Sequence, residues 1–203
     1  MCRFLETLRI EQGRLWHLPL HQARLERTLR ACCPGAPVPQ LEALLQSLPL
    51  TEEPTRLRVV YGPQGVEAVE TFPYALRNIR SLRLVPADGV DYAYKRADRR
   101  VLDHLLAQRG TADEVLLVQD GRLTDTSFSN IALSDGLRWY TPAKPLLAGT
   151  MRQHLLAEGR IAERDILAAD LPRYHSLSLI NAMLPLGRLV VPVRAIQTLC
   201  DRL

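Results

Sequence analysis

The chain has 203 residues, of which 47% are hydrophobic and 24% charged, as in an ordinary globular protein with one large domain or two small ones. Its net charge of +4 comes from 26 basic and 22 acidic residues that are spread along the chain, which slightly favours anionic small molecules and is weak evidence for nucleic-acid binding. No apolar run approaches membrane-spanning length, and the N-terminus lacks the apolar core of a signal peptide. We therefore expect a cytoplasmic protein that does not bind membranes.

Cysteines and histidines indicate neither a metal site nor a disulfide framework. No CxxC spacing occurs, and the histidines are not spaced as metal ligands. Walker, GxGxxG, HExxH and GxSxG motifs are also missing from the sequence. We expect free thiols in a reducing compartment and no bound metal.

In the first part of the chain, residues 3–9 and 14–17 predict a hairpin of two strands. Pro19 then opens a helix, whose apolar side carries Leu18, Leu25 and Leu29. Its polar side carries His21, Arg24, Arg27 and Thr28. A loop at 33–39 and a short helix at 40–47 follow. Further strands are predicted at 56–61, 66–72 and 79–85, the first two forming a hairpin.

The second part begins with the sequence YKRADRRVLDHLLAQRG from position 94. Leu102 and Leu105 belong to an apolar helical stripe that ends near Gly110. A buried strand at 115–118 precedes Asp120-Gly121, a strong hairpin signal that recurs at 135–136. The remaining predicted elements are a helix at 151–158 and strands near 160–165, 176–181 and 188–193.

These elements predict an α+β fold in two domains. The smaller, N-terminal domain covers residues 1–85. The C-terminal domain covers residues 86–203 and carries Lys95. The polar segment 86–91 is the best candidate for the linker.

Lys95 is the first candidate for chemistry, as a lysine that forms a Schiff base. Such a lysine needs a depressed pKa. Asp98 is a suitable N-cap for a helix beginning at Arg99, which would place Lys95 beside a positive helix end, and Arg96 and Arg99 add positive charge. The alternative is a solvated basic patch, and for the lysine considered alone it is the favoured interpretation.

Asp125, in the sequence LTDTSFSN, is a candidate partner for the ring nitrogen of pyridoxal phosphate. Its alternative is a carboxylate that binds neighbouring hydroxyl groups. In the sequence GTMR, Gly149 and the first amides of the next helix resemble an anion site, although Thr150 and Gln153 also fit a capping box. Arg24 could bind the same anion through its planar fork.

The order of these motifs is more informative than any one of them. FLETLR, HxxRL, the lysine element, LTDTSFSNIAL, GTMR and INAMLPL together resemble the class IV pyridoxal-phosphate-dependent aminotransferases. That family includes branched-chain and D-amino-acid aminotransferases and 4-amino-4-deoxychorismate lyase. The resemblance extends from Phe4 to about Val193. It implies the two-domain fold of that family with a shortened N-terminus, and a cofactor in the cleft between the domains.

The resemblance also implies roles for individual residues. Lys95 would bind the cofactor aldehyde and carry a proton to and from the substrate. Asp125 stands where the family usually has glutamate. The phosphate would be bound by the residues that match the family's phosphate-binding positions: Arg24, Gly149, Thr150, Met151, Asn181 and Ala182. Tyr61 stands where an arginine often holds a substrate carboxylate.

The expected reaction is transfer of an amino group between an amino acid and a 2-oxo acid by a homodimer. The MRQ and NAMLP sequences are more typical of the lyase, which eliminates pyruvate to give 4-aminobenzoate. A non-catalytic descendant that binds pyridoxal phosphate or another protein, and a basic nucleic-acid binder, remain as alternatives. The sequence does not give the substrate or its stereochemistry.

Overall fold

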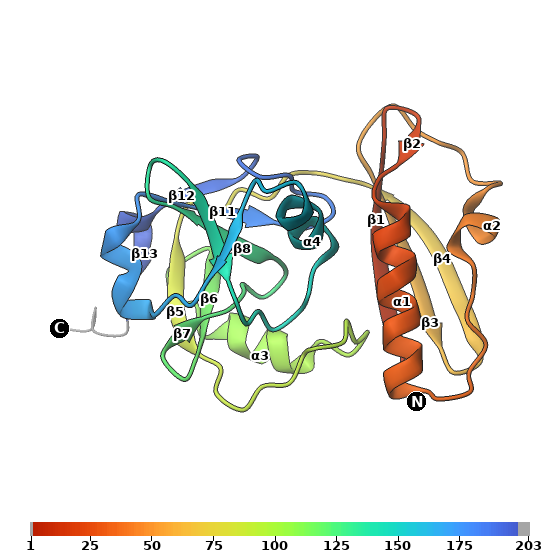
Figure 1. Ribbon diagram of the computed structural model, residues 1–203, viewed down its shortest axis with the longest axis horizontal. Helices are drawn as coiled ribbons and strands as arrows, with labels where there is room; N and C mark the ends of the chain where they lie inside the picture. The colour runs from red at the N-terminus through yellow and green to blue at the C-terminus, as the bar shows by residue number, and fades with distance from the viewer. Residues whose placement is uncertain (1, 199–203) are drawn as a thin grey trace. The chain divides into compact units, whose positions relative to one another are not determined.

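The computed structural model describes residues 2–198, in which the chain forms two compact units (Figure 1). The first consists of Met1–Leu76 together with Tyr94–Asp98, and the second of Arg77–Ala93 and Arg99–Leu203. This division differs from the predicted boundary between residues 85 and 86, which would cut the strand Leu82–Pro86. It also places Lys95 in the first unit.

The first unit is a four-stranded antiparallel sheet in the order β2-β1-β3-β4. Its strands are β1 (Phe4–Glu11), β2 (Arg14–Leu15), β3 (Thr55–Gly62) and β4 (Gly65–Pro73), and its helices are α1 (Leu18–Cys32) and α2 (Leu41–Leu45). The predicted hairpins at both ends of the unit are confirmed. The predicted long and short helices also form.

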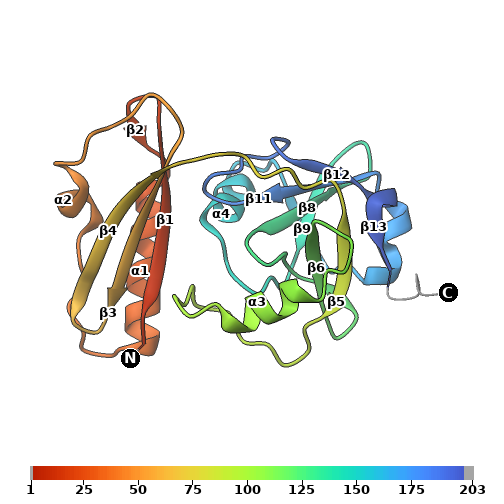
Figure 2. The same cartoon turned by 180° about the vertical axis from the view of Figure 1, so that it is seen from behind.

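The hydrophobic core of this unit lies between one face of the sheet and the helices. Alternate residues of β1 point to this face, so Phe4, Leu8 and Ile10 pack with Leu25 and Leu29 of α1. Figure 2 shows β1, β3 and β4 in front of α1. Glu6 lies on the core face too, although it is charged, because it shares the alternation of Phe4 and Leu8.

The segment Tyr94–Asp98 pairs with the start of β1. Leu5 N–H donates to the Lys95 carbonyl over 2.9 Å, and Ala97 N–H donates to the Arg3 carbonyl over 2.8 Å. β2 pairs only with Ile10 and Glu11, at the other end of β1. The lysine segment is therefore joined by backbone hydrogen bonds to the strand that carries Glu6.

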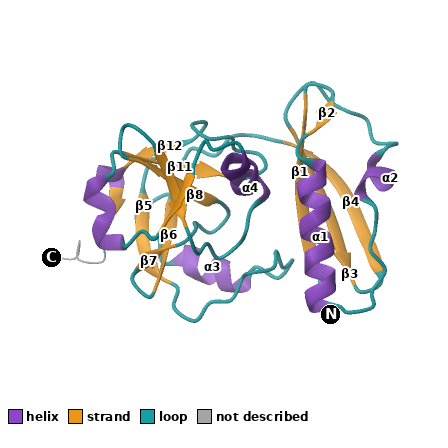
Figure 3. Cartoon of the chain, viewed as in Figure 1, coloured by secondary structure: helices purple, strands orange, loops and turns teal. Residues whose placement is uncertain are grey.

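The second unit contains two sheets and the other helices of the described residues (Figure 3). One sheet has the order β13-β5-β6-β7 and the other β10-β9-β8-β11-β12. The strands are β5 (Leu82–Pro86), β6 (Glu114–Gln119), β7 (Arg122–Leu123), β8 (Asn130–Ser134), β9 (Trp139–Pro142), β10 (Ala162–Arg164), β11 (Ser176–Ile180), β12 (Val190–Pro192) and β13 (Ile196–Gln197). The helices are α3 (Arg100–Ala107), α4 (Thr150–Ala157) and the short 3-10 helices η1 (Ala168–Arg173) and η2 (Val193–Ala195).

Two local predictions about this unit are wrong. Segment 86–91 is no linker, because Ala87 is buried and its N–H donates to Val118 O over 2.7 Å. Asp98 does not cap α3, which begins at Arg100 with Arg99 in the N-cap position and no side-chain capping bond. The Asp120-Gly121 turn is confirmed, with both residues at positive φ (48° and 75°) between β6 and β7.

Within residues 2–198, none of the helices is both long and apolar enough to cross a membrane. Among the same residues, no cluster of three or more potential metal ligands occurs. Cys2, Cys32 and Cys33 are free thiols, while Cys200 lies outside the described residues.

Candidate active site

Asp125 is held in a tight turn that connects β7 to β8. Its side chain accepts hydrogen bonds from Asn130 Nδ2 (2.8 Å, to Oδ1) and from Leu147 N–H (2.9 Å, to Oδ2). The backbones of Asp125 and Asn130 also form an isolated antiparallel bridge. Two neutral donors thus fix the direction of a carboxyl group that is only 4% exposed.

Burial raises the pKa of Asp125 to about 7, because the ionised form is poorly solvated there. The Asn130 and Leu147 hydrogen bonds and the charge of Arg152 lower the pKa but do not offset the burial. Among residues 2–198, no basic side chain forms an ion pair with Asp125. A site of this kind suits a cationic N–H group, which would favour the carboxylate.

The nearby hydroxyl groups of the TSFSN turn mostly bind one another, not Asp125. Thr126 Oγ1 and Ser129 Oγ lie 2.8 Å apart, and Thr124 Oγ1 donates to Leu117 O. Ser127 Oγ is buried and has no hydrogen-bond partner among the described residues. Asp125 therefore does not bind the hydroxyl groups considered as its alternative partners, and Ser127 offers a polar atom that the sequence did not single out.

Gly149 is required by a close approach between two segments. A Cβ atom at this position would lie 2.0 Å from Asn130 Oδ1, although the backbone (φ −72°) is accessible to any residue. Asn130 Nδ2 also donates to Leu147 O over 2.8 Å. The same asparagine thus joins Asp125 to the segment that leads into α4.

Gly149 is the N-cap of α4, and Thr150 and Met151 are its first two helical residues, both buried. Thr150 is therefore the first helical residue, one position beyond the N-cap position that the predicted capping box of Thr150 and Gln153 requires. The first N–H groups of a helix have no intrahelical partner and carry partial positive charge. This helix start can therefore bind an anion.

Asn181 and Ala182 follow β11 directly. Asn181 Oδ1 accepts from Met183 N–H (2.9 Å), and Nδ2 donates to Phe128 O (3.4 Å). Ala182 is 9% exposed. Asn181 is thereby connected to the turn that contains Asp125, within the second unit.

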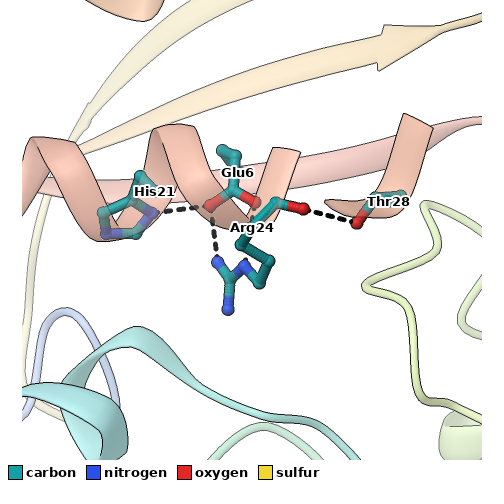
Figure 4. A network of polar contacts seen from close by, with 4 residues as sticks. All are labelled: Glu6, His21, Arg24 and Thr28. Carbon is teal, nitrogen blue, oxygen red and sulfur yellow. Dashed lines mark hydrogen bonds and ion pairs between the residues drawn. The ribbon is translucent and has the colours of Figure 1, made fainter. Parts of the chain in front are cut away.

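In the first unit, Arg24 forms a buried cluster with Glu6 and His21 (Figure 4). Arg24 Nε and Nη2 bind the two carboxylate oxygens of Glu6 over 2.8 and 2.6 Å. Burial lowers the pKa of His21; Glu6 raises it, and Arg24 and Lys95 lower it further. The positive charge of Lys95 thus contributes to the low pKa of His21 in this cluster. Sequence reasoning missed Glu6, although a charged residue on the apolar face of FLETLR was a usable signal.

Tyr61 belongs to the core of the first unit. It is fully buried and its ring centroid lies 5.8 Å from that of Phe4. Burial raises the pKa of its hydroxyl, as does the Glu6 carboxylate. It is a neutral packing residue at any ordinary pH.

Comparison with known proteins identifies the family. The family model described as amino-transferase class IV matches residues 3–196. The chain belongs to the class IV aminotransferase family. It is 37% identical over 186 residues to an uncharacterized protein of Haemophilus influenzae, covering 90% of this chain and 98% of that protein.

Two solved structures show what the fold resembles. A proposed 4-amino-4-deoxychorismate lyase from Haemophilus somnus is 33% identical, with a TM-score of 0.86, over 92% of this chain and 98% of that one. The pyridoxal-phosphate-bound form of a hypothetical aminotransferase from Mycobacterium tuberculosis is 22% identical, with a TM-score of 0.76, over 96% of this chain and 81% of that one. The second likeness concerns the fold alone. Together these comparisons confirm the α+β fold expected from the sequence.

Proposed function

We propose that this chain is a pyridoxal-phosphate enzyme that transfers an amino group between an amino acid and a 2-oxo acid. The observation that carries the proposal is the buried carboxyl of Asp125, whose pKa is raised to about 7 by burial and which forms no ion pair among the described residues. A protonated pyridine nitrogen is such a partner. Membership of the class IV family, over residues 3–196, supports the same conclusion.

The described residues fit this cofactor. Asp125 would bind the ring nitrogen, Ser127 Oγ is a buried polar atom that can take a further hydrogen bond, and the α4 start from Gly149 to Met151 would bind phosphate. Asn181 and Ala182 would border the phosphate. When bound, the cofactor supplies an aldehyde and an electron-withdrawing ring.

The chain itself would supply an amine, a fixed carboxylate and cations. Lys95 would bind the aldehyde and then move a proton to and from the substrate carbon. Asp125 would keep the ring nitrogen protonated, because its carboxylate is stabilised by the positive charge it faces. Arg24 would bind the phosphate, with its orientation set by Glu6.

The sequence allows a sharp test of Lys95, because its two lysines are Lys95 and Lys144. The protein should be incubated with pyridoxal phosphate, reduced with borohydride and mapped by peptide mass. We expect the reduced adduct on Lys95, its loss in Lys95→Ala, and no change in Lys144→Ala, since Lys144 is exposed. An unchanged visible absorbance band in Lys95→Ala would overturn the assignment.

A second candidate, pyruvate elimination from 4-amino-4-deoxychorismate, is favoured by the 33% identity to the Haemophilus somnus protein. Two assays separate the reactions. Aminodeoxychorismate should release pyruvate if the lyase is correct, and an amino acid with 2-oxoglutarate should give glutamate if the aminotransferase is correct. A yellow protein that is inert in both assays would instead indicate a non-catalytic descendant.

A further inference from the structure

Glu6 is a charged side chain on the core face of β1, where its neighbours are apolar. It is fully buried. Three hydrogen bonds reach its carboxylate, two from Arg24 and one of 2.6 Å from His21 Nδ1. Figure 4 shows the carboxylate between these two side chains of α1.

The charges of this cluster are well defined. Burial acts to raise the pKa of Glu6, but Arg24 and His21 lower it more, to about 2. Glu6 is therefore ionised at neutral pH and can only accept hydrogen bonds. Because burial also lowers the pKa of His21, His21 is neutral and carries its proton on Nδ1. The cluster holds one anion, one cation and one neutral donor.

The consequence for Arg24 is a fixed guanidinium plane. A fork-to-fork contact with Glu6 occupies Nε and Nη2 and sets both direction and rotation. The other terminal nitrogen of Arg24 points away from the carboxylate in Figure 4. A planar guanidinium has N–H donors on more than one edge, so the edge away from Glu6 has a defined direction.

We propose that Glu6 is a positioning residue, which holds Arg24 in the orientation that binds the phosphate of the cofactor. The proposal rests on the proposed function, since it deepens the role given there to Arg24. The competing role for Glu6 is purely structural, a clamp between β1 and α1. The two roles differ in one measurable respect: only positioning acts through the phosphate.

The test compares the affinities of pyridoxal phosphate and pyridoxal, which lacks the phosphate, by equilibrium dialysis. Wild type should bind pyridoxal phosphate far more tightly. In Glu6→Gln we expect its affinity to fall by about 10- to 100-fold, the loss typical of one or two charge-assisted hydrogen bonds, with pyridoxal affinity unchanged. Equal losses for both ligands, or no loss for either, would overturn the proposal.

Further variants keep the test decisive if Glu6→Gln folds poorly. Glu6→Asp retains the charge but shortens the side chain, so it should weaken pyridoxal phosphate selectively and less severely. Arg24→Lys removes the guanidinium that Glu6 would position. Adding Glu6→Gln to Arg24→Lys should therefore leave the ratio of the pyridoxal-phosphate and pyridoxal affinities the same as in Arg24→Lys alone. Glu70→Gln removes an exposed carboxylate 3.5 Å from Arg58 in the same sheet, and it should leave both affinities unchanged. Wild type that fails to bind pyridoxal phosphate would refute the proposed function itself, a distinct result.

Discussion

Asp125 makes the stability of the cofactor-free protein depend on pH in an unusual direction. Its pKa is about 7 in the folded protein and about 3.9 in an unfolded chain. Between these values the folded state binds more protons than the unfolded state. The free energy of unfolding therefore falls as pH rises from about 4 to about 7, and this loss is complete above pH 7.

We expect Asp125 to lower stability across this range by at most about 4 kcal/mol. Asp125→Asn removes the titration and keeps the shape, so its stability relative to wild type should increase steadily from pH 4 to pH 7. Urea unfolding at several pH values measures the difference. A difference that is constant with pH would contradict the raised pKa.

Gly149→Ala should destabilise the second unit by about 2–4 kcal/mol, because the new Cβ would displace a packed polar side chain. The new atom would lie 2.0 Å from Asn130 Oδ1. The expelled asparagine would lose its hydrogen bonds to Asp125 and Leu147. Thermal unfolding measures the cost.

The matched control is Asn130→Ala, which removes the obstacle. In that background Gly149→Ala should cost much less than in wild type, so the two substitutions should be strongly non-additive. Additive effects would show that the glycine is required for another reason.

At the scale of elements, the buried pair of Glu6 and Arg24 joins β1 to α1. Arg24→Met leaves a buried carboxylate without its cation, which should cost about 3–5 kcal/mol. The double variant Glu6→Leu with Arg24→Met replaces both charges by apolar groups and should recover most of this loss. Chemical denaturation of the three proteins tests this, and equal stability of the single and double variants would contradict it.

The same pair should make the free energy of unfolding depend on pH in the acid range. The Glu6 pKa is lowered from 4.5 to about 2, so its contribution is present above pH 4.5 and is lost as pH falls towards 2. Compared with the double variant, wild type should lose stability more steeply between these values. Parallel acid limbs would show that the pKa of Glu6 is not lowered in the folded state.

Elements with a strong local signal were predictable from the sequence. The alternation of FLETLRI and the Asp120-Gly121 turn depend on a few neighbouring residues, and both match the structure. β13 was missed, because Ile196 and Gln197 are defined only by pairing with Leu82 and Arg83 far away in the chain. The same reason explains why segment 86–91 was wrongly predicted to be a linker. Its polar composition is typical of a linker, but its backbone groups form hydrogen bonds with β6, which lies far away in the sequence.

The sequence predicted which residues belong to the candidate site, but it did not predict how they are arranged. The TSFSN and GTMR motifs can be read locally, but the asparagine that joins them, Asn130, acts through contacts over 5 and 17 positions. Glu6 reaches Arg24 over 18 positions. Pairs this far apart in sequence cannot be recognised from a short stretch of residues. The residues that orient the site could therefore be identified only from the structure.

At the scale of the whole molecule, the chain passes between the two units three times, at 76/77, 93/94 and 98/99. The last two passages enclose Tyr94–Asp98, a five-residue segment of the first unit that lies in sequence between two stretches of the second. The segment that carries Lys95 is therefore paired by its backbone with β1. Its position depends on two backbone hydrogen bonds, to Leu5 and through Ala97 to Arg3.

Ala97→Pro should release this segment from β1. Proline has no N–H group, so the 2.8 Å bond from Ala97 to the Arg3 carbonyl cannot form. We expect at least about a tenfold loss of pyridoxal-phosphate attachment to Lys95, since the lost bond and the added freedom of the segment are together worth more than about 1.4 kcal/mol. Borohydride trapping at several cofactor concentrations measures the loss. Ala97→Gly retains the N–H group and should bind the cofactor much more like wild type. If Ala97→Pro and wild type attach the cofactor equally well, then pairing with β1 does not position the lysine.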